Sequence, residues 1–103
     1  MSVLDHLRAT AASTPAATLL VDRDGDWSAA RLWSRVQQLA DELVTVGAQR
    51  VSSTLDNGGE AVALDLALRR IGAVHLPLPG FFTAAQVAQA QRSAGADTHV
   101  LAR

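Results

Sequence analysis

The chain has 103 residues, of which 49% are hydrophobic, and it carries a formal net charge of −1 with an isoelectric point near 6.2. This length and hydrophobic fraction indicate one domain with a single core. The nine basic residues, all arginine, are scattered from Arg8 to Arg103, which argues against a nucleic-acid-binding surface or a polybasic membrane patch.

The chain contains neither cysteine nor lysine. The first absence excludes disulfides and thiolate metal ligands, and the second excludes reactions that need a lysine ammonium group. No apolar run approaches the roughly 20 residues that cross a bilayer, and the first six residues lack the basic start and apolar stretch of a signal peptide. We therefore expect a cytoplasmic protein without a membrane span.

The first part of the chain predicts a short helix followed by a hairpin. Ser2 lies at a capping signature, and the helix that it opens should end before Pro15. Residues 17–22 form a plausible strand, residues 23–26 have turn chemistry, and Trp27 begins a very short returning strand. We expect this small hairpin at the edge of a sheet.

A long amphipathic helix follows the hairpin. Ser28 is a good N-cap for this helix, and Gly47 is its natural C-terminal stop. Its apolar positions recur at alternating spacings of four and three and are Leu32, Val36, Leu39, Leu43 and Val46.

A βαβ unit occupies the middle of the chain. Residues 51–55 read as a strand, residues 56–59 as a turn, residues 59–71 as a helix that is apolar on nearly every side, and residues 73–76 as a second strand. Two short strands joined by a helix indicate a parallel sheet. The first strand carries three consecutive hydroxyl side chains, which makes it more polar than a central parallel strand usually is.

One more helix and strand complete the pattern. Thr83 and Gln86 form a capping box, Gly95 ends the helix that they open, and residues 98–102 read as a last strand. The expected fold class is therefore α/β, a three-layer αβα arrangement with a mostly parallel sheet and an N-terminal edge hairpin, with residues 1–103 as a single unit.

The three histidines are the first candidates for chemistry, because they alone titrate near neutral pH. His6 is expected on a helix, and His75 and His99 are expected on two strands. The latter two could be close if their strands are neighbours. No second ligand at metal spacing accompanies any of them, so we favour structural or surface roles.

The turn from Asp56 to Gly59 lies between the carboxyl end of a strand and the amino end of a helix, where open α/β sheets tend to bind ligands. Backbone N–H groups could hold an anion there. The turn nevertheless lacks both the GxGxxG and the GxxxxGK[ST] phosphate-binding patterns. Capping and turn formation explain these residues without a ligand.

Two further features could have a function: an acidic pattern in the hairpin, and an apolar loop tip. Asp22, Asp24 and Asp26 resemble a loose metal-loop pattern, but a solvated hairpin explains them better than a calcium site. Phe81 and Phe82 form an apolar loop tip that either covers the core or contacts another domain. We predict no catalytic, cofactor-binding or metal-binding residue in this chain.

Two strings resemble a known family. Residues 27–48, WSAARLWSRVQQLADELVTVGA, and residues 55–102, beginning LDNGGEAVALDLALRRIGAVHLPL, are similar to the amino-terminal part of the adenylate-forming (AMP-binding) enzymes. Among the subfamilies, these segments resemble the acyl-CoA synthetases in particular. Ala29 and Arg31 replace the family's usual tyrosine and glutamate at packing positions.

The resemblance implies a role for the chain within a larger ligase. The full-length parent would activate a carboxylic acid with ATP to an acyl adenylate and pass it to a thiol, using ATP, Mg and coenzyme A. The family's reacting motifs, two of which need lysine, lie farther downstream. This chain would be a noncatalytic N-terminal scaffold subdomain without a cofactor of its own.

The partner implied by the resemblance is the remainder of the parent enzyme, and the apolar surface left exposed could also join copies into a homo-oligomer. The alternative is a self-standing small α/β module that binds a ligand or protein through the Asn57 loop or the Phe81–Phe82 tip.

Overall fold

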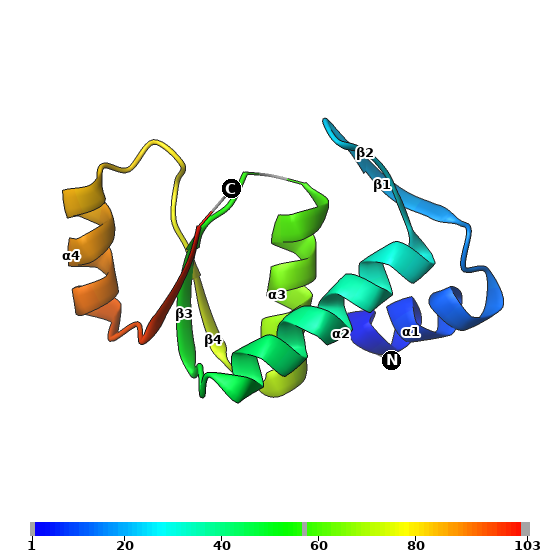
Figure 1. Cartoon of the computed structure of the whole chain (residues 1–103), viewed down its shortest axis with the longest axis horizontal. Helices are drawn as coiled ribbons and strands as arrows, with labels where there is room; N and C mark the ends of the chain where they lie inside the picture. Colours follow the sequence, from blue (N-terminus) through cyan, green and yellow to red (C-terminus); the bar gives the residue numbers. More distant parts are fainter. Residues whose placement is uncertain (1, 57, 102–103) are drawn as a thin grey trace.

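The computed structural model describes residues 2–56 and 58–101, so Asn57 and Ala102, which the sequence placed in a turn and in the last strand, lie outside the described residues. In chain order the elements are α1 (Val3–Ser13), β1 (Thr18–Asp22), β2 (Gly25–Ser28), α2 (Ala29–Thr45), β3 (Arg50–Thr54), α3 (Gly59–Ile71), β4 (Val74–Pro77), α4 (Ala84–Ala94) and β5 (Thr98–Leu101). Figure 1 shows their arrangement in space.

A parallel sheet with the strand order β4-β3-β5 lies between two helical layers. Helix α4 covers one side of this sheet, whereas α3, with α2 beyond it, covers the other (Figure 1). This arrangement confirms the predicted α/β fold with a parallel sheet. It also places β3 in the centre, so that each β3 side chain faces one helical layer or the other.

The hairpin of β1 and β2 is a sheet of its own and makes no ladder with the parallel strands that the structure describes. The sequence predicted the hairpin but expected it at a sheet edge. Strand β2 passes directly into α2 at Ser28, and Ala29 N–H donates to the Ala17 carbonyl at 2.8 Å. The hairpin is therefore fixed to the start of α2, on the far side of α3 from the sheet (Figure 1).

The core lies mainly between α2 and α3. The predicted α2 stripe is buried at Leu32, Val36, Leu39 and Leu43, and α3 adds Leu64, Leu66 and Leu68. Val46, expected in the same stripe, is 67% exposed because α2 ends at Thr45 and Val46 is its C-cap. On α3, which was predicted to be apolar on nearly every side, Val62 is the exception and faces solvent.

The predicted helix ends are confirmed. Ser28 Oγ accepts a hydrogen bond from Arg31 N–H, and Thr83 and Gln86 form the reciprocal capping box. Gly95 is the left-handed C-cap of α4. None of the helices that the structure describes is long and apolar enough to span a membrane.

Candidate functional site

At the start of α3, where the sequence favoured capping and turn formation over an anion site, the helix N-terminus is occupied by the side chain of Asp22 from the hairpin. Asp22 Oδ2 accepts hydrogen bonds from Gly59 N–H at 2.9 Å and from Trp27 Nε1–H at 2.8 Å. Its Oδ1 accepts a third from Asp24 N–H at 2.9 Å. The hydrogen bond from Gly59, followed by the smaller effects of the other donors, lowers the pKa of Asp22 below its ordinary value.

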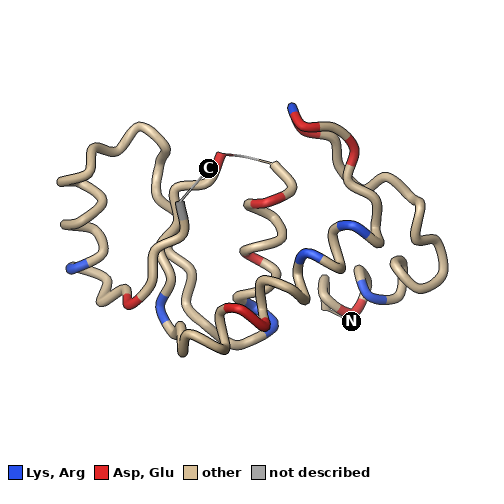
Figure 2. Tube along the Cα trace, viewed as in Figure 1, with Lys and Arg blue, Asp and Glu red and all other residues tan. Residues whose placement is uncertain are grey.

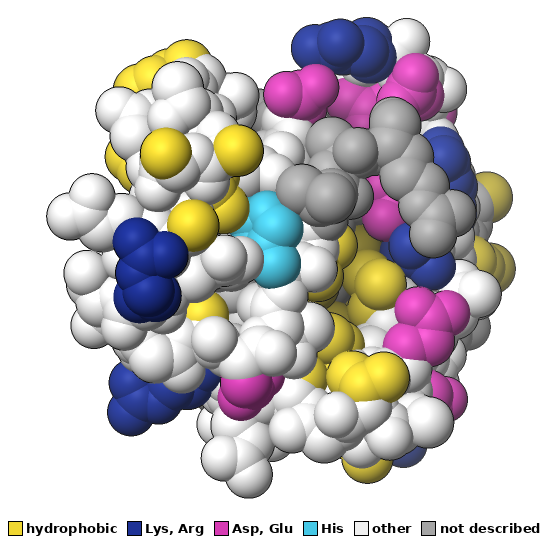
Figure 3. Space-filling view, turned by 60° about the vertical axis from the view of Figure 1, so that its left-hand side comes forward, with side chains coloured by type: hydrophobic (Ala, Val, Ile, Leu, Met, Phe, Trp, Pro, Cys, Tyr) yellow, Lys and Arg dark blue, Asp and Glu magenta, His cyan; other side chains and the backbone are white. Residues whose placement is uncertain are grey.

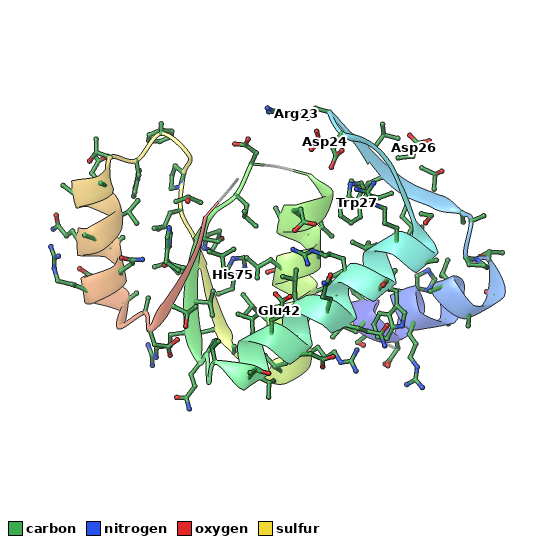
Figure 4. All side chains as sticks on the ribbon, viewed as in Figure 1. Arg23, Asp24, Asp26, Trp27, Glu42 and His75 are labelled. Carbon is green, nitrogen blue, oxygen red and sulfur yellow. The ribbon has the colours of Figure 1, made fainter. Side chains whose placement is uncertain are left out.

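Close packing fixes the hairpin at this point. Trp27 is only 3% exposed, and a Cβ atom at Gly59 would overlap its indole ring, so that only glycine fits there. The Arg31 guanidinium lies 3.8 Å from the centre of the same ring. Figure 4 shows Trp27 directed toward the start of α3, with Arg23, Asp24 and Asp26 nearer the hairpin tip.

The charge of this region does not suit the phosphates of ATP. A cavity of about 190 Å³ beside the start of α3 is lined by four carboxylates and two guanidinium groups, and Asp22 already uses the Gly59 amide. The four acidic residues are Asp22, Asp24, Asp56 and Glu60, and the two basic ones are Arg23 and Arg31. The residues present therefore do not form an ATP phosphate site.

His75 and His99 do not meet, because their strands flank β3 on opposite edges. His99 Nδ1 lies 2.6 Å from Ser52 Oγ, and Gln91 of α4 donates to the same hydroxyl at 3.1 Å. His6 is exposed on α1. The sequence left open whether the two strand histidines are close, and the strand order answers that they are apart.

His75 joins β4 to both β3 and α3. Its Nε2 lies 2.9 Å from Ser53 Oγ, and its Nδ1 lies 3.0 Å from Asp65 Oδ1. Asp65 also forms an ion pair with Arg69, at 3.0 Å. Both buried β3 serines are thus hydrogen-bonded to a histidine of a flanking strand. The polarity of residues 52–54 was the sequence signal for these pairs, but it does not name their partners.

The remaining candidates lie on the surface. Asp24 and Asp26 are exposed, and among residues 2–56 and 58–101 no three histidine or acidic side chains come together in a way that could hold a metal ion. Phe81 is 83% exposed, and its ring meets that of Phe82 edge to face. Figure 3 shows a face on which hydrophobic side chains line a hollow beside a histidine.

The parallel sheet with a helical layer on each side, together with the hairpin held against α3, makes this an α/β fold. A family model described as AMP-binding enzyme matches residues 7–103. The chain belongs to this family, and its fold is that of the N-terminal subdomain of the adenylate-forming enzymes.

Solved structures show the same fold. The N-terminal domain of FACL13 from Mycobacterium tuberculosis is 22% identical, with a TM-score of 0.84 over 95% of this chain and 26% of its own. The NpsA N-terminal subdomain from Klebsiella oxytoca is 21% identical, with a TM-score of 0.78 over 98% and 29%. MatB from Rhodopseudomonas palustris is 28% identical, with a TM-score of 0.74 over 84% and 18%.

The chain therefore spans less than a third of the length of each of these structures. A search of curated proteins found no match.

Proposed function

We propose that residues 1–103 are a scaffold subdomain of an AMP-forming ligase similar to acyl-CoA synthetases and take no part in the adenylation reaction. The parent enzyme would join a carboxylic acid to AMP at the expense of ATP and transfer the acyl group to a thiol such as coenzyme A. The observation that carries this proposal is the family match over residues 7–103, combined with coverage of less than a third of each similar structure.

The site geometry supports the noncatalytic part of the proposal. The one helix start that follows a central strand is capped by a carboxylate from within the chain, and acidic side chains outnumber basic ones around it. ATP, Mg and coenzyme A would then be held by the remainder of the parent enzyme. The contribution of this subdomain would be its sheet and its α2–α3 layer, which give the rest of the enzyme a fixed surface.

Acid-dependent ATP–pyrophosphate exchange tests the proposal. We expect no exchange above background from the 103-residue chain with a panel of carboxylic acids, and no shift of its melting temperature with ATP and Mg²⁺, because a ligand that binds only the folded state raises that temperature. Robust exchange would overturn the proposal.

Asp22→Asn is a useful second protein for this assay. It removes the negative charge from the start of α3 while keeping a hydrogen-bond acceptor. If ATP stabilises the original chain and Asp22→Asn changes that stabilisation, a nucleotide binds at this helix start. That result would contradict the proposal that the subdomain is only a scaffold.

A further inference from the structure

The central strand of the sheet is polar where a buried parallel strand is normally apolar. Ser52 is fully buried and Ser53 is 4% exposed, yet both carry hydroxyl groups into the interior. Each hydroxyl has a histidine partner on the neighbouring strand. An apolar side chain would fill either position without needing a hydrogen-bond partner. Packing alone therefore does not explain why these two positions hold serine.

Among the residues that the structure describes, only one of the two pairs continues to a carboxylate. His75 lies between Ser53 Oγ at 2.9 Å and Asp65 Oδ1 at 3.0 Å. His99, in contrast, has Ser52 Oγ at one ring nitrogen and Thr54 Oγ1 at 3.4 Å from the other. The described part of the chain thus contains a serine–histidine–aspartate series and, on the other face of β3, a serine–histidine pair for which it shows no acidic partner.

The carboxylate determines which nitrogen of His75 carries the proton. A carboxylate oxygen can only accept, so His75 Nδ1 donates to Asp65, and in the neutral imidazole Nε2 is then the acceptor for the Ser53 hydroxyl proton. Arg69 Nε, 3.0 Å from Asp65 Oδ2, holds the carboxylate in place from the next turn of α3. This is the arrangement in which a histidine can act as a general base toward a serine.

The series borders space that a small molecule can enter. Ser53 and His75 both line a cavity of about 430 Å³, whose wall includes Leu78, Pro79 and Phe81. His75 and Asp65 also line a neighbouring cavity of about 710 Å³, whose wall includes Val62 and Leu66. A few polar side chains among apolar lining residues are typical of a small-molecule site.

We propose that Ser53 is a nucleophile, with His75 as its general base and Asp65 as the residue that orients His75. The substrate class is an activated ester or acyl derivative with a small apolar acyl group, which the Leu78 and Phe81 walls would accommodate. This proposal is independent of the scaffold role, because it concerns the α3 face of the sheet and needs neither ATP nor the remainder of the parent.

The step balances without a cofactor. Ser53 Oγ bonds to the acyl carbon as its proton passes to His75 Nε2, the bond from the acyl carbon to the leaving oxygen breaks, and the proton passes from His75 to that oxygen. Water then adds to the acyl-serine by the same route, which releases the carboxylic acid and restores the hydroxyl.

Covalent labelling with diisopropyl fluorophosphate tests the proposal on the 103-residue chain. The Ser53 oxygen would displace fluoride from phosphorus, with its proton leaving by way of His75. We expect mass spectrometry to place the label on Ser53, and p-nitrophenyl acetate to be hydrolysed with an initial burst. Ser53→Ala should abolish both, and His75→Gln should slow labelling about 10²-fold or more, as expected for loss of a general base.

Ser52→Ala and His99→Gln are the matched controls, because they alter the neighbouring pair, formed between β3 and β5, without touching the series. Both should keep the labelling rate within about twofold of the original chain. Asp65→Asn separates orientation from packing: it preserves shape, and we expect at least a tenfold loss of labelling with an unchanged circular dichroism spectrum.

Failure to label Ser53 in the folded chain would overturn the proposal. So would equal labelling of Ser52, or a Ser53 labelling rate that His75→Gln leaves unchanged in a variant whose melting temperature shows that it is folded.

Discussion

Asp22 shows how one side chain determines what a site can bind. Its carboxylate accepts hydrogen bonds from Gly59, Trp27 and Asp24, and thereby places a negative charge at the positive end of the α3 dipole. An external phosphate at the same position would meet that charge. The helix start is consequently a structural joint between the hairpin and the βαβ unit.

The pKa of Asp22, lowered chiefly by the Gly59 N–H, makes this joint sensitive to acid. The unfolded carboxyl takes up its proton near pH 3.8, whereas the folded one does so only at lower pH. Its stabilising contribution is therefore complete above that range and is lost as the pH falls through the folded pKa. Asp22→Asn should lower the urea midpoint at pH 7, and this difference should shrink toward pH 3.

Asp24→Asn is the control for that measurement, because Asp24 belongs to the same turn but its carboxylate is exposed. Its urea midpoint should follow that of the original chain at both pH values. Asp97, whose pKa is lowered chiefly by the Thr98 hydroxyl, leaves some acid sensitivity in every variant. A deficit of Asp22→Asn that is equal at pH 7 and pH 3 would contradict the prediction.

The sequence predicted that Asp22 belongs to a turn but not that it binds the start of α3. The spacing of Asp22, Asp24 and Asp26 is a local pattern, and it indicated a solvated turn. The partner of Asp22 is 37 residues away, at Gly59. Ser53 and Asp65 were missed as partners of His75 for the same reason, since each lies on a different element from that histidine.

Helix boundaries, in contrast, follow from local chemistry. The capping box at Thr83 and the glycine at Gly95 bound α4 where the sequence predicted, because each acts on backbone groups within one turn. The position of the hairpin is a property of packing between elements. Its turn residues predicted its shape but not the neighbour against which it lies.

Helix α4 should be the least protected of the three helices that surround the sheet. None of its residues is buried, whereas α2 and α3 contribute most of the core. Side-chain hydrogen bonds that connect it to β3 include Gln91 to Ser52 and Arg50 to the Ala94 carbonyl. We expect its amides to exchange with deuterium faster than those of α3, in hydrogen-exchange mass spectrometry at neutral pH.

Gln91→Ala sharpens this measurement, because it removes one of those hydrogen bonds while leaving the α2–α3 core intact. Exchange should accelerate in α4 and stay constant in α3. Protection of α4 equal to that of α3 in the original chain would contradict the expectation.

At the scale of the whole molecule, charge is dispersed while apolar surface is exposed. Figure 2 shows arginine and acidic residues interspersed along the described chain. Strand β4 is an edge strand of the described sheet that carries no Lys, Arg, Asp or Glu, and Val74 on it is 54% exposed, whereas Pro77 at its end cannot donate to a further strand. Such an edge can pair with another strand, either of the parent enzyme or of a second copy.

We therefore predict that the 103-residue chain self-associates. Its weight-average sedimentation coefficient should rise with concentration, and Val74→Lys should reduce that rise by placing a charge on the edge strand. Val44→Lys is the control, since Val44 is similarly exposed but lies on α2. A constant coefficient over a hundredfold concentration range would contradict this prediction.

The contact between Asp22 and the first amide of α3 also has a kinetic consequence. It can form only after the chain between the hairpin and Gly59, which includes all of α2 and β3, has closed into a loop. The hairpin and α3 are each local structures, whereas their junction is not. Weakening the junction should therefore act mainly on the rate of unfolding and leave the rate of folding nearly unchanged.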